Sequence, residues 1–540
     1  MRVADQEGQW QCRAALYNQI SASRSLGHVV TSRTRRPTLA RNAVANWSTF
    51  LFAAIVSFFL SPFVVHHLGA TNYGVWTLLG GLVGYLGLLD IGLRNAVSRY
   101  IAHYQAAGKH AESSSIASAA LKLFLMLGIL AIVLSGALAF FAPRVFNIPE
   151  ALVDDARVVV VLGGLSIAVG LVSGVFAGIV TGLQRFDVFA CLEVFVTTVR
   201  TVAFVLSLWE GYGLVALACI QLGSSLLSLI VLWVIAHRLY PGLRLKVLGS
   251  LYPQIRTILS FSISLSVLYL FGQLIYYSGT LVIAAFLPIE AVTFFSIAGV
   301  VCFQARGVAA SLSNLMAPRV SALTSMGSSR VAQDIVAVAR IATLVVTPIA
   351  VVFVLRGESF ITLWMGSEYG PASGGVLRIL AIVLWLEASR SVVIFSLVGM
   401  GRQRTLIPGM ALEAAGNLAL TVALVRPFGI VGASLGTLIP SMLVGLGYIP
   451  RCLSQEAAVP ASLFYRKALL QPTAACVPFA LASAAIERFT PAGSLAVFLT
   501  QVIATLPMVP VGAWFLCLST AEKQHVKLRL RDLVGGSLRW

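Results

Sequence analysis

Charged residues are scarce in this sequence. Only 11% of its 540 residues are Asp, Glu, Lys or Arg, whereas soluble domains carry about 25% charged residues. Hydrophobic residues make up 58% of the chain, and they gather in runs long enough to cross a bilayer as helices. The composition therefore excludes a string of soluble domains and predicts an all-α polytopic membrane protein.

Several chemical signatures are also missing. The seven cysteines are scattered, without a Cys-x-x-Cys pair or a Cys/His spacing suited to zinc, so neither a disulfide framework nor a metal site is supported. The glycine-rich stretch at 79–87, LGGLVGYLG, lacks the Gly-Lys-Ser/Thr ending of a phosphate-binding loop, and close helix packing is its expected role. No loop between the apolar runs is long enough for a soluble catalytic domain. We therefore expect neither enzymatic activity nor a cofactor.

The apolar runs, bounded by charge, Pro and Gly, predict about fourteen transmembrane helices. Their approximate ranges are 43–66, 74–96, 119–141, 157–181, 186–209, 213–236, 257–286, 291–315, 340–356, 374–398, 405–425, 429–449, 467–486 and 492–518. The ninth helix is short, so we expect it to begin earlier or to bend at Pro348.

The net charge of +18 follows the predicted membrane topology. Most Lys and Arg lie in short clusters at alternate helix ends, not along one stripe, so we expect no nucleic-acid partner. With the N-terminus in the cytoplasm, only a few arginines fall on the outer side: Arg144, Arg157, Arg356, Arg426 and Arg488. By the positive-inside rule, this bias predicts that both termini are cytoplasmic.

The sequence also contains an internal repeat. Four similarities occur in the same order at offsets of 216 to 218 residues, for example WEGYGLVALACI from Trp209 and RPFGIVGASLGT from Arg426. Each repeat holds six helices, so both should have one orientation and be related by an axis along the membrane normal. The predicted domains are a polar, basic cytoplasmic tail (1–42), an N-lobe (43–240), a cytoplasmic linker (241–256), a C-lobe (257–451), two additional helices (452–520) and a basic cytoplasmic tail (521–540).

Several motifs resemble those of a known transporter family. LGATNYGVWTLL, followed by LLDIGLRNAVSRYIAHYQAAGK from Leu88, resembles the opening signature of bacterial polysaccharide-biosynthesis flippases. These are lipid-linked oligosaccharide exporters of the multidrug/oligosaccharidyl-lipid/polysaccharide (MOP) superfamily. The similarity continues through TGLQRFDVFACLEVF, MAPRVSALTSMG, LWMGSEY and LVGMGRQRTLIPGMALEAAGN, and covers the chain from about Arg41 to Arg451.

This resemblance implies two six-helix lobes around a cavity that opens to alternate sides of the bacterial inner membrane. The implied cargo is an oligosaccharide on a polyprenyl diphosphate, moved to the periplasmic leaflet for O-antigen of lipopolysaccharide, capsule or exopolysaccharide. The implied partners are a proton or sodium ion for coupling, membrane lipids, and polymerase or export machinery. The alternatives are a cation-coupled multidrug or small-molecule exporter of the same superfamily and a flippase for the peptidoglycan lipid precursor.

Ionisable residues inside the predicted helices are the strongest signal for a site. An Arg or Asp at the centre of a membrane helix costs about 2.5–3.5 kcal/mol on insertion scales. Arginine offers a permanently charged, forked donor that suits a diphosphate, and aromatic or amide side chains can meet sugar hydroxyls. The candidate substrate-binding residues are Arg200, Arg306, Arg390, Arg94, Gln273 and Tyr276.

A coupled transporter also needs a titratable anion within the membrane. The candidates for the coupling ion are Asp90, Glu193, Glu387 and Glu413, with Asn417 one turn from Glu413 as a polar partner. Structural roles remain open for several of these charges. Arg94 could anchor the helix at the headgroups, Asp90 could pair with Arg94 four residues later, and Glu387 and Arg390 could neutralise each other three residues apart.

Overall fold

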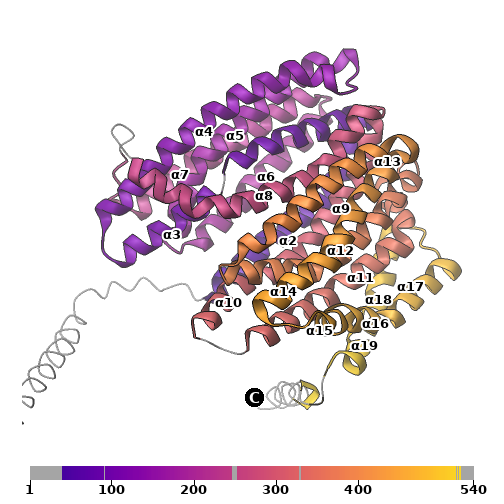
Figure 1. The fold of residues 1–540 in the computed structure, drawn as a ribbon. Coiled ribbons are helices and arrows are strands. Elements are labelled where there is room, and N and C mark those ends of the chain that lie inside the picture. The colour runs from indigo at the N-terminus through magenta and orange to yellow at the C-terminus, as the bar shows by residue number, and fades with distance from the viewer. Residues whose placement is uncertain are drawn as a thin grey trace, which may run out of the picture. The chain divides into compact units, whose positions relative to one another are not determined.

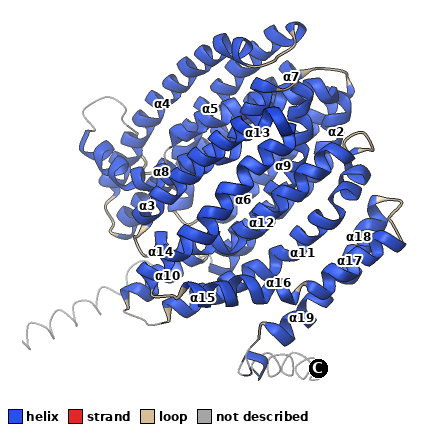
Figure 2. Ribbon diagram, turned by 45° about the vertical axis from the view of Figure 1, so that its right-hand side comes forward, coloured by secondary structure: helices blue, strands red, loops and turns tan. Residues whose placement is uncertain are grey.

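The computed structural model describes residues 39–90, 92–245, 252–326, 330–518, 520 and 522–524. Nearly all of the predicted N-terminal tail, part of the predicted linker and most of the C-terminal tail lie outside these residues. The chain divides into two units, Met1–Ala43 and Val44–Trp540, and the second holds the helices discussed below. Within the described ranges the protein is helical throughout and contains no strand (Figure 2).

The helices follow one another along the chain as labelled in Figure 1. The α-helices are α2 (Leu39–Leu86), α3 (Leu93–Ala106), α4 (His110–Val145), α5 (Val153–Gly182), α6 (Phe186–Trp209), α7 (Leu214–Leu239), α8 (Tyr252–Phe286), α9 (Ile289–Ser313), α10 (Met316–Ser325), α11 (Val331–Met365), α12 (Gly370–Gly399), α13 (Ile407–Met442), α14 (Ile449–Ala457), α15 (Ala461–Phe464), α16 (Gln471–Ala475), α17 (Val477–Phe489), α18 (Leu495–Thr505) and α19 (Met508–Leu516). Short 3-10 helices occupy Gly87–Asp90 (η2), Glu150–Leu152 (η3) and Gln403–Leu406 (η4), and π-helices occupy Leu443–Tyr448 (η5) and Tyr465–Leu470 (η6).

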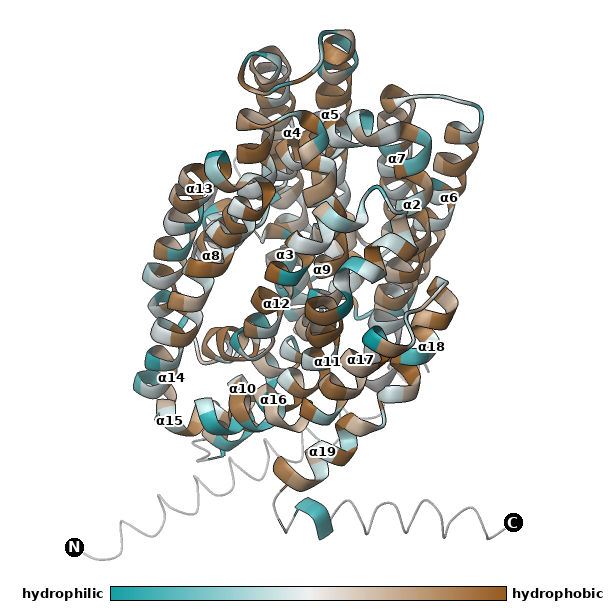
Figure 3. Ribbon diagram, turned by 90° about the vertical axis from the view of Figure 1, so that its right-hand side faces the viewer, coloured by the Kyte–Doolittle hydropathy of each residue, from teal (hydrophilic) through white to brown (hydrophobic). Residues whose placement is uncertain are grey.

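Twelve helical segments of the described chain are long and apolar enough to span a membrane. Two of them, Trp47–Ala106 and Gln403–Ala457, are 60 and 55 residues long, whereas about 20 residues cross the hydrocarbon core. Each contains a glycine with positive φ, Gly69 at 76° and Gly429 at 58°, where the helical backbone is broken. The twelve segments therefore accommodate fourteen crossings, and the predicted all-α polytopic membrane protein is confirmed. Along the helices, hydrophobic residues dominate, and hydrophilic residues gather toward the ends (Figure 3).

One predicted helix was wrong and another was extended. The second predicted helix, 74–96, is not continuous, because the α-helix ends at Leu86 and Gly92 takes a left-handed conformation (φ 64°) before α3 begins. The ninth, predicted at 340–356 with an earlier start or a bend at Pro348, does begin earlier: α11 spans 35 residues from Val331, passes through Pro348 and is non-helical at Arg356. In both cases hydropathy located the apolar run but did not define the helix ends.

The backbone supports the internal repeat. Gln184, between α5 and α6, has φ 59°, and Gly401, between α12 and η4, has φ 74°. These two left-handed turns lie at the offset of the sequence repeat. Only a few per cent of non-glycine residues adopt such a backbone, so its recurrence at Gln184 agrees with a duplicated element.

The three largest clusters of buried hydrophobic residues are one core that the two lobes share and two that they do not, and a small fourth cluster lies among the C-terminal helices. The shared core joins N-lobe residues such as Leu78 to C-lobe residues such as Ile283. A second core, around Phe124, contains only N-lobe residues, the following linker and Ile258 of α8. A third, around Val392, contains only C-lobe residues and the chain that follows them. The lobes are therefore packed together at one end, here called the shared end, and have separate cores at the other, here called the divided end.

Polar contacts also join the lobes at the shared end. Thr71 Oγ1 donates to Glu290 Oε1 at 2.7 Å, and Thr293 Oγ1 donates to the carbonyl of Ala70. Asn147 Nδ2 donates to the carbonyl of Leu287 at 3.0 Å. A Cβ at Gly74 would clash with the carbonyl of Ile289, so this glycine permits the close approach of the two lobes.

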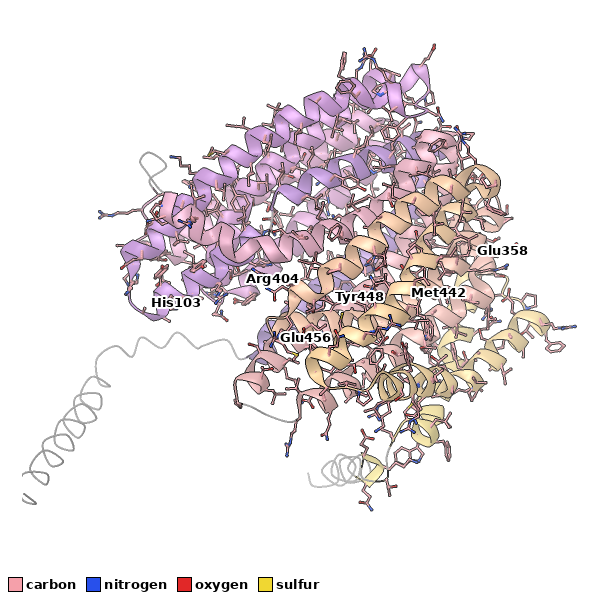
Figure 4. All side chains as sticks on the ribbon, viewed as in Figure 1. His103, Glu358, Arg404, Met442, Tyr448 and Glu456 are labelled. Carbon is pink, nitrogen blue, oxygen red and sulfur yellow. The ribbon has the colours of Figure 1, made fainter. Side chains whose placement is uncertain are left out.

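The glycine-rich stretch 79–87 also packs between the lobes, as expected. A Cβ at Gly84 would lie 2.8 Å from Cζ of Tyr277 on α8. The neighbouring Tyr85 and Tyr277 rings are 5.5 Å apart. The labelled side chain of Glu358 in the C-lobe and that of Glu456, just after the C-lobe, lie far apart (Figure 4).

Candidate functional site

The N-lobe contains a half-open polar cavity between its own helices, here called the N-lobe cavity. It measures about 160 Å³ and is lined by residues of α3, α5, α6 and α7, which lie on the N-lobe side of Figure 1. Its charged lining residues are Arg94, Glu193 and Arg200. The polar lining is completed by Gln221, Ser173, Ser224, Ser225 and Ser228. The structure thus brings together three residues that the sequence had singled out separately.

The break in the second predicted helix positions Arg94. The turn at Gly92 redirects the chain into α3, and a left-handed residue is accommodated best by glycine. Asp90 Oδ1 accepts a hydrogen bond from the backbone N–H of Arg94 at 3.4 Å, which satisfies one of the free donors in the first turn of α3. Asp90 therefore acts on the backbone of Arg94, and no ion pair joins their side chains among the described contacts.

Arg94 lies against a glycine of the next helix. A Cβ at Gly174 of α5 would approach Nε of Arg94 to 3.4 Å, so the glycine leaves room for the guanidinium group. No carboxylate lies within 4.0 Å of this guanidinium in the part of the chain that the structure describes. Arg94 therefore presents a cation at the edge of the N-lobe cavity.

Arg200 is half-buried near the middle of α6. Its Nη1 donates to Oε1 of Gln221 at 3.4 Å, a neutral partner on α7. Glu193, two turns earlier on α6, interacts with it electrostatically, but among the described residues no carboxylate oxygen comes within 4.0 Å of its guanidinium. The N-lobe cavity thus holds two cations and one anion, without a direct ion pair.

The C-lobe holds a chain of four charges, here called the C-lobe charge chain. Arg306 on α9 approaches Glu387 on α12 at 3.7 Å, and Glu387 is 3.3 Å from Arg390. Nη1 of Arg390 then donates to Oε1 of Glu413 on α13 at 2.7 Å. Opposite charges alternate along the chain and sum to zero. The predicted neutralisation of Glu387 by Arg390 is present, and it extends to two further residues.

Burial increases along this chain. The side chain of Arg306 is 42% exposed and that of Glu387 16%, whereas Arg390 and Glu413 are 7% and 1% exposed. Ser441 Oγ donates to Glu413 Oε1 at 2.7 Å, but Oε2 of Glu413 is buried without a hydrogen-bond partner. Nε of Arg390 is likewise buried without a partner, and an unmade hydrogen bond at a buried charge is costly.

A neutral polar cluster lies one turn from Glu413. Ser278 of α8 donates to Oδ1 of Asn417, and Nδ2 of Asn417 donates to Thr437 Oγ1 at 3.0 Å. This Asn417 was expected to be a partner of Glu413, but its amide is occupied by α8 and by the second half of α13. It links α8 to both halves of α13.

Tyr276 and Gln273 lie on α8, close to the contact of Tyr277 with Gly84 of the N-lobe. The guanidinium carbon of Arg306 lies 5.9 Å from the centre of the Tyr276 ring, within cation–π range. The ring of Phe303, one turn before Arg306, lies 5.4 Å from the ring of Tyr276. Gln273 is half-buried one turn before Tyr276 and Tyr277. These residues bring aromatic faces and a partly exposed cation together beside the contact of Tyr277 with the N-lobe.

The sequence analysis missed one strongly interacting arginine. Arg356, counted as an outer topology charge, is 1% exposed and binds Glu487 through Nε at 2.6 Å. Its Nη2 donates to Gln501 at 2.6 Å, and its guanidinium carbon lies 4.4 Å from the centre of the Phe498 ring. These contacts fix α17 and α18 to α11. The available signal was a Glu and a Gln within the last two apolar runs.

Metal ligation finds no support in the described ranges. No three His, Cys, Asp or Glu side chains gather there in a group that could hold a metal ion. The chemistry that the two charged groups offer is the binding of anions by arginine and of cations by glutamate.

Comparison with known proteins places the chain in a family. The family model described as polysaccharide biosynthesis protein matches residues 39–324, which is more than half of the chain. The chain belongs to the polysaccharide biosynthesis protein family. Two curated relatives of this family member are an uncharacterised membrane protein, EpsK, of Bacillus subtilis strain 168 and a putative O-antigen transporter of Shigella flexneri. The first is 22% identical over 92% of the chain and 98% of its own length, and the second is 19% identical over 74% and 93%.

Solved structures show that the family member has the fold of MOP superfamily transporters. The lipid II flippase MurJ, in an inward closed conformation, matches with a TM-score of 0.66 at 12% identity, over 88% of this chain and 98% of its own. An inward-facing multidrug resistance MATE family transporter of the MOP superfamily matches with a TM-score of 0.65 at 16% identity, over 77% and 98%. The predicted two-lobed fold with additional C-terminal helices is consistent with both matches.

Proposed function

We propose that this family member is a flippase that moves a polyprenyl-diphosphate-linked oligosaccharide from the cytoplasmic to the periplasmic leaflet of the bacterial inner membrane. Membership of the polysaccharide biosynthesis family supports a role in making cell-surface polysaccharide. The similarity to a putative O-antigen transporter supports transport over synthesis. The MOP fold supports a mechanism of alternating access by two lobes.

The division of the hydrophobic core is the observation that carries this proposal. Both lobes share buried residues at the shared end, but each has a core of its own at the divided end. Separate cores let the lobes part at the divided end without exposing either interior. The positive-inside bias orients the divided end toward the cytoplasm, the side on which the cargo is loaded.

Arg306 and Tyr276 are the residues that we assign to cargo on the C-lobe side. Arg306 retains a partly exposed guanidinium although it approaches Glu387. The ring of Tyr276 lies within cation–π range of this guanidinium, next to Tyr277, whose ring packs against Gly84 at the boundary between the lobes. We assign Gln273 to the same surface, where its amide supplies donors and acceptors for sugar hydroxyls. Arg390 would act on cargo only through its neighbours, because it is 7% exposed.

Coupling to a cation is the second part of the proposal. Glu413 has a buried carboxylate oxygen without a partner, and Glu387 bridges two arginines. A proton or sodium ion arriving at either glutamate would compete with Arg390 and alter the contacts between α12 and α13. Asp90, at the end of η2, and Glu193, in the N-lobe cavity, are the corresponding N-lobe candidates.

Reconstitution tests the proposed function directly. The purified protein would be placed in proteoliposomes with a fluorescent polyprenyl-diphosphate oligosaccharide, and a membrane-impermeant lectin would detect sugar that changes leaflet. We expect rapid exposure with the wild type and slow exposure with Arg306→Gln. The matched control is Arg378→Gln, since Arg378 is also half-exposed and pairs with Glu358 in the C-lobe. Equal flipping rates for Arg306→Gln and the wild type would show that Arg306 does not bind the cargo. Transport of small amphipathic cations without transport of the lipid-linked oligosaccharide would refute the proposed function.

A further inference from the structure

The N-lobe cavity holds more positive than negative charge, because two arginines and one glutamate line it. Arg94 and Arg200 both line it, and neither guanidinium has a carboxylate within 4.0 Å among the described residues. With Glu193 ionised, the three charged residues sum to one positive charge. Because a cation in a membrane-spanning helix is expensive unless it is paired or solvated, the cavity is arranged to accept an anion.

We propose that the N-lobe cavity is a phosphate-binding site built by the N-lobe alone. That its natural ligand is the diphosphate of the lipid-linked cargo rests on the function proposed above. All lining residues belong to α3, α5, α6 and α7, and none comes from the C-lobe. The site is therefore not assembled or taken apart when the two lobes separate.

The donors of the cavity suit an oxyanion. Two guanidinium groups offer forked, permanently charged N–H pairs, the arrangement that matches phosphate oxygens. The hydroxyls of Ser224 and Ser225 donate to carbonyls of their own helix, at Ile220 and Gln221. Those of Ser173 and Ser228 have no such bond in the described structure, so they remain available to a ligand.

The volume of the cavity suits a phosphate group better than a sugar chain. Its volume is about 160 Å³, below the 300–1,000 Å³ typical of pockets that enclose a drug-sized ligand. An oligosaccharide does not fit into this space, whereas a phosphate group does. The cavity therefore recognises the part that all polyprenyl-linked cargoes share, and sugar selectivity must arise elsewhere, for example near Tyr276.

Glu193 allows the effect of charge on anion binding to be tested in both directions. As the one carboxylate lining the cavity, it weakens the attraction for an anion. Replacing it by an amide of the same shape raises the net charge of the cavity from one to two. Glu193→Gln should therefore bind an anion more tightly than the wild type, whereas Arg200→Gln should bind it less tightly.

Binding of inorganic pyrophosphate to the purified full chain tests the site without transport. We expect saturable binding by calorimetry in detergent free of phospholipid, weakened roughly ten- to hundredfold by Arg200→Gln or Arg94→Gln, the range for losing a charged hydrogen bond. Glu193→Gln should tighten it, and Arg157→Gln should leave it unchanged, because Arg157 pairs with Asp154 at the far end of α5. Arg200→Lys keeps the charge and serves if the glutamine variant fails to fold.

Competition then distinguishes the sources of phosphate. Displacement of pyrophosphate by a short polyprenyl diphosphate but not by dispersed phosphatidylglycerol supports the cargo as ligand. Equal displacement by both supports the phosphate site but overturns the cargo as its source. Absence of pyrophosphate binding, or equal affinity in the wild type and Glu193→Gln, overturns the site itself, even if flipping is observed. Binding without any flipping in proteoliposomes would overturn the proposed function and leave the site standing.

Discussion

At the buried end of the C-lobe charge chain, we expect replacement of the arginine and of the glutamate to destabilise the protein by different amounts. Arg390→Met removes the central cation and leaves Glu413, which is 1% exposed, without an ion-pair partner. Glu413→Gln instead leaves Arg390 paired with Glu387 at 3.3 Å, and the surplus positive charge falls on Arg306, which is 42% exposed and can be solvated. We therefore expect the arginine variant to be the more destabilised of the two.

The magnitude follows from the geometry of the pair. Unit charges about 4 Å apart attract by ~4 kcal/mol at an effective dielectric constant of ~20, and breaking a buried pair by removing one partner costs about 3–5 kcal/mol. Arg390→Met should therefore lose about 3–5 kcal/mol of stability. Glu413→Gln should lose about 1–3 kcal/mol, because its hydrogen bonds weaken but no unpaired charge remains buried. The double variant restores a balanced site and should be more stable than Arg390→Met.

Thermal unfolding of the purified protein in one detergent measures these differences. A double-mutant cycle of the two variants gives their coupling energy, which contacting residues place at about 0.5–3 kcal/mol. The control is Arg378→Met, because Arg378 forms an exposed pair with Glu358 and such pairs contribute about 0–1 kcal/mol. If Arg390→Met is as stable as this control, or more stable than Glu413→Gln, the argument from the buried unpaired charge of Glu413 is refuted.

Other features of the fold give further predictions. Glu487→Ala should release the contact with buried Arg356 and lower the stability by about 2–3 kcal/mol, less than for a fully buried pair because Glu487 is partly exposed. Limited proteolysis near the last two helices should become faster, and unchanged proteolysis would contradict the role of this ion pair in holding α17 to α11. Gly84→Val should push Tyr277 away and slow flipping, and Tyr277→Ala should restore the rate in the double variant. A reporter enzyme fused after Pro149 should be active on the periplasmic side, and cytoplasmic activity would reverse the assigned orientation.

The helical membrane architecture was largely readable from the sequence, because apolar runs of the required length and basic clusters are local signals. The repeat was readable for the same reason, and the matched turns at Gln184 and Gly401 agree with it. The helix ends were not readable. The break at Gly92 follows no proline and falls within the predicted helix 74–96, so only the backbone conformation reveals it.

Which charged residues contact one another could not be predicted from the sequence. Arg200 and Arg306 were both predicted to bind substrate, but the first lines a cavity of the N-lobe and the second ends a neutral chain in the C-lobe. The contact of Arg390 with Glu413 joins different helices, and no periodicity predicts such a pairing. The pairing of Glu387 with Arg390 was predictable, because residues three apart share a helix face.

The different charge balance of the two lobes has an electrical consequence. Displacing the C-lobe charge chain in the membrane field moves no net charge, because its members cancel. The empty N-lobe cavity carries one positive charge, and moving such a charge across the full membrane potential involves about 2.3 kcal/mol per 100 mV. A bound diphosphate with two negative charges would change that sum to one negative charge. The membrane voltage would therefore push the empty and the loaded N-lobe in opposite directions.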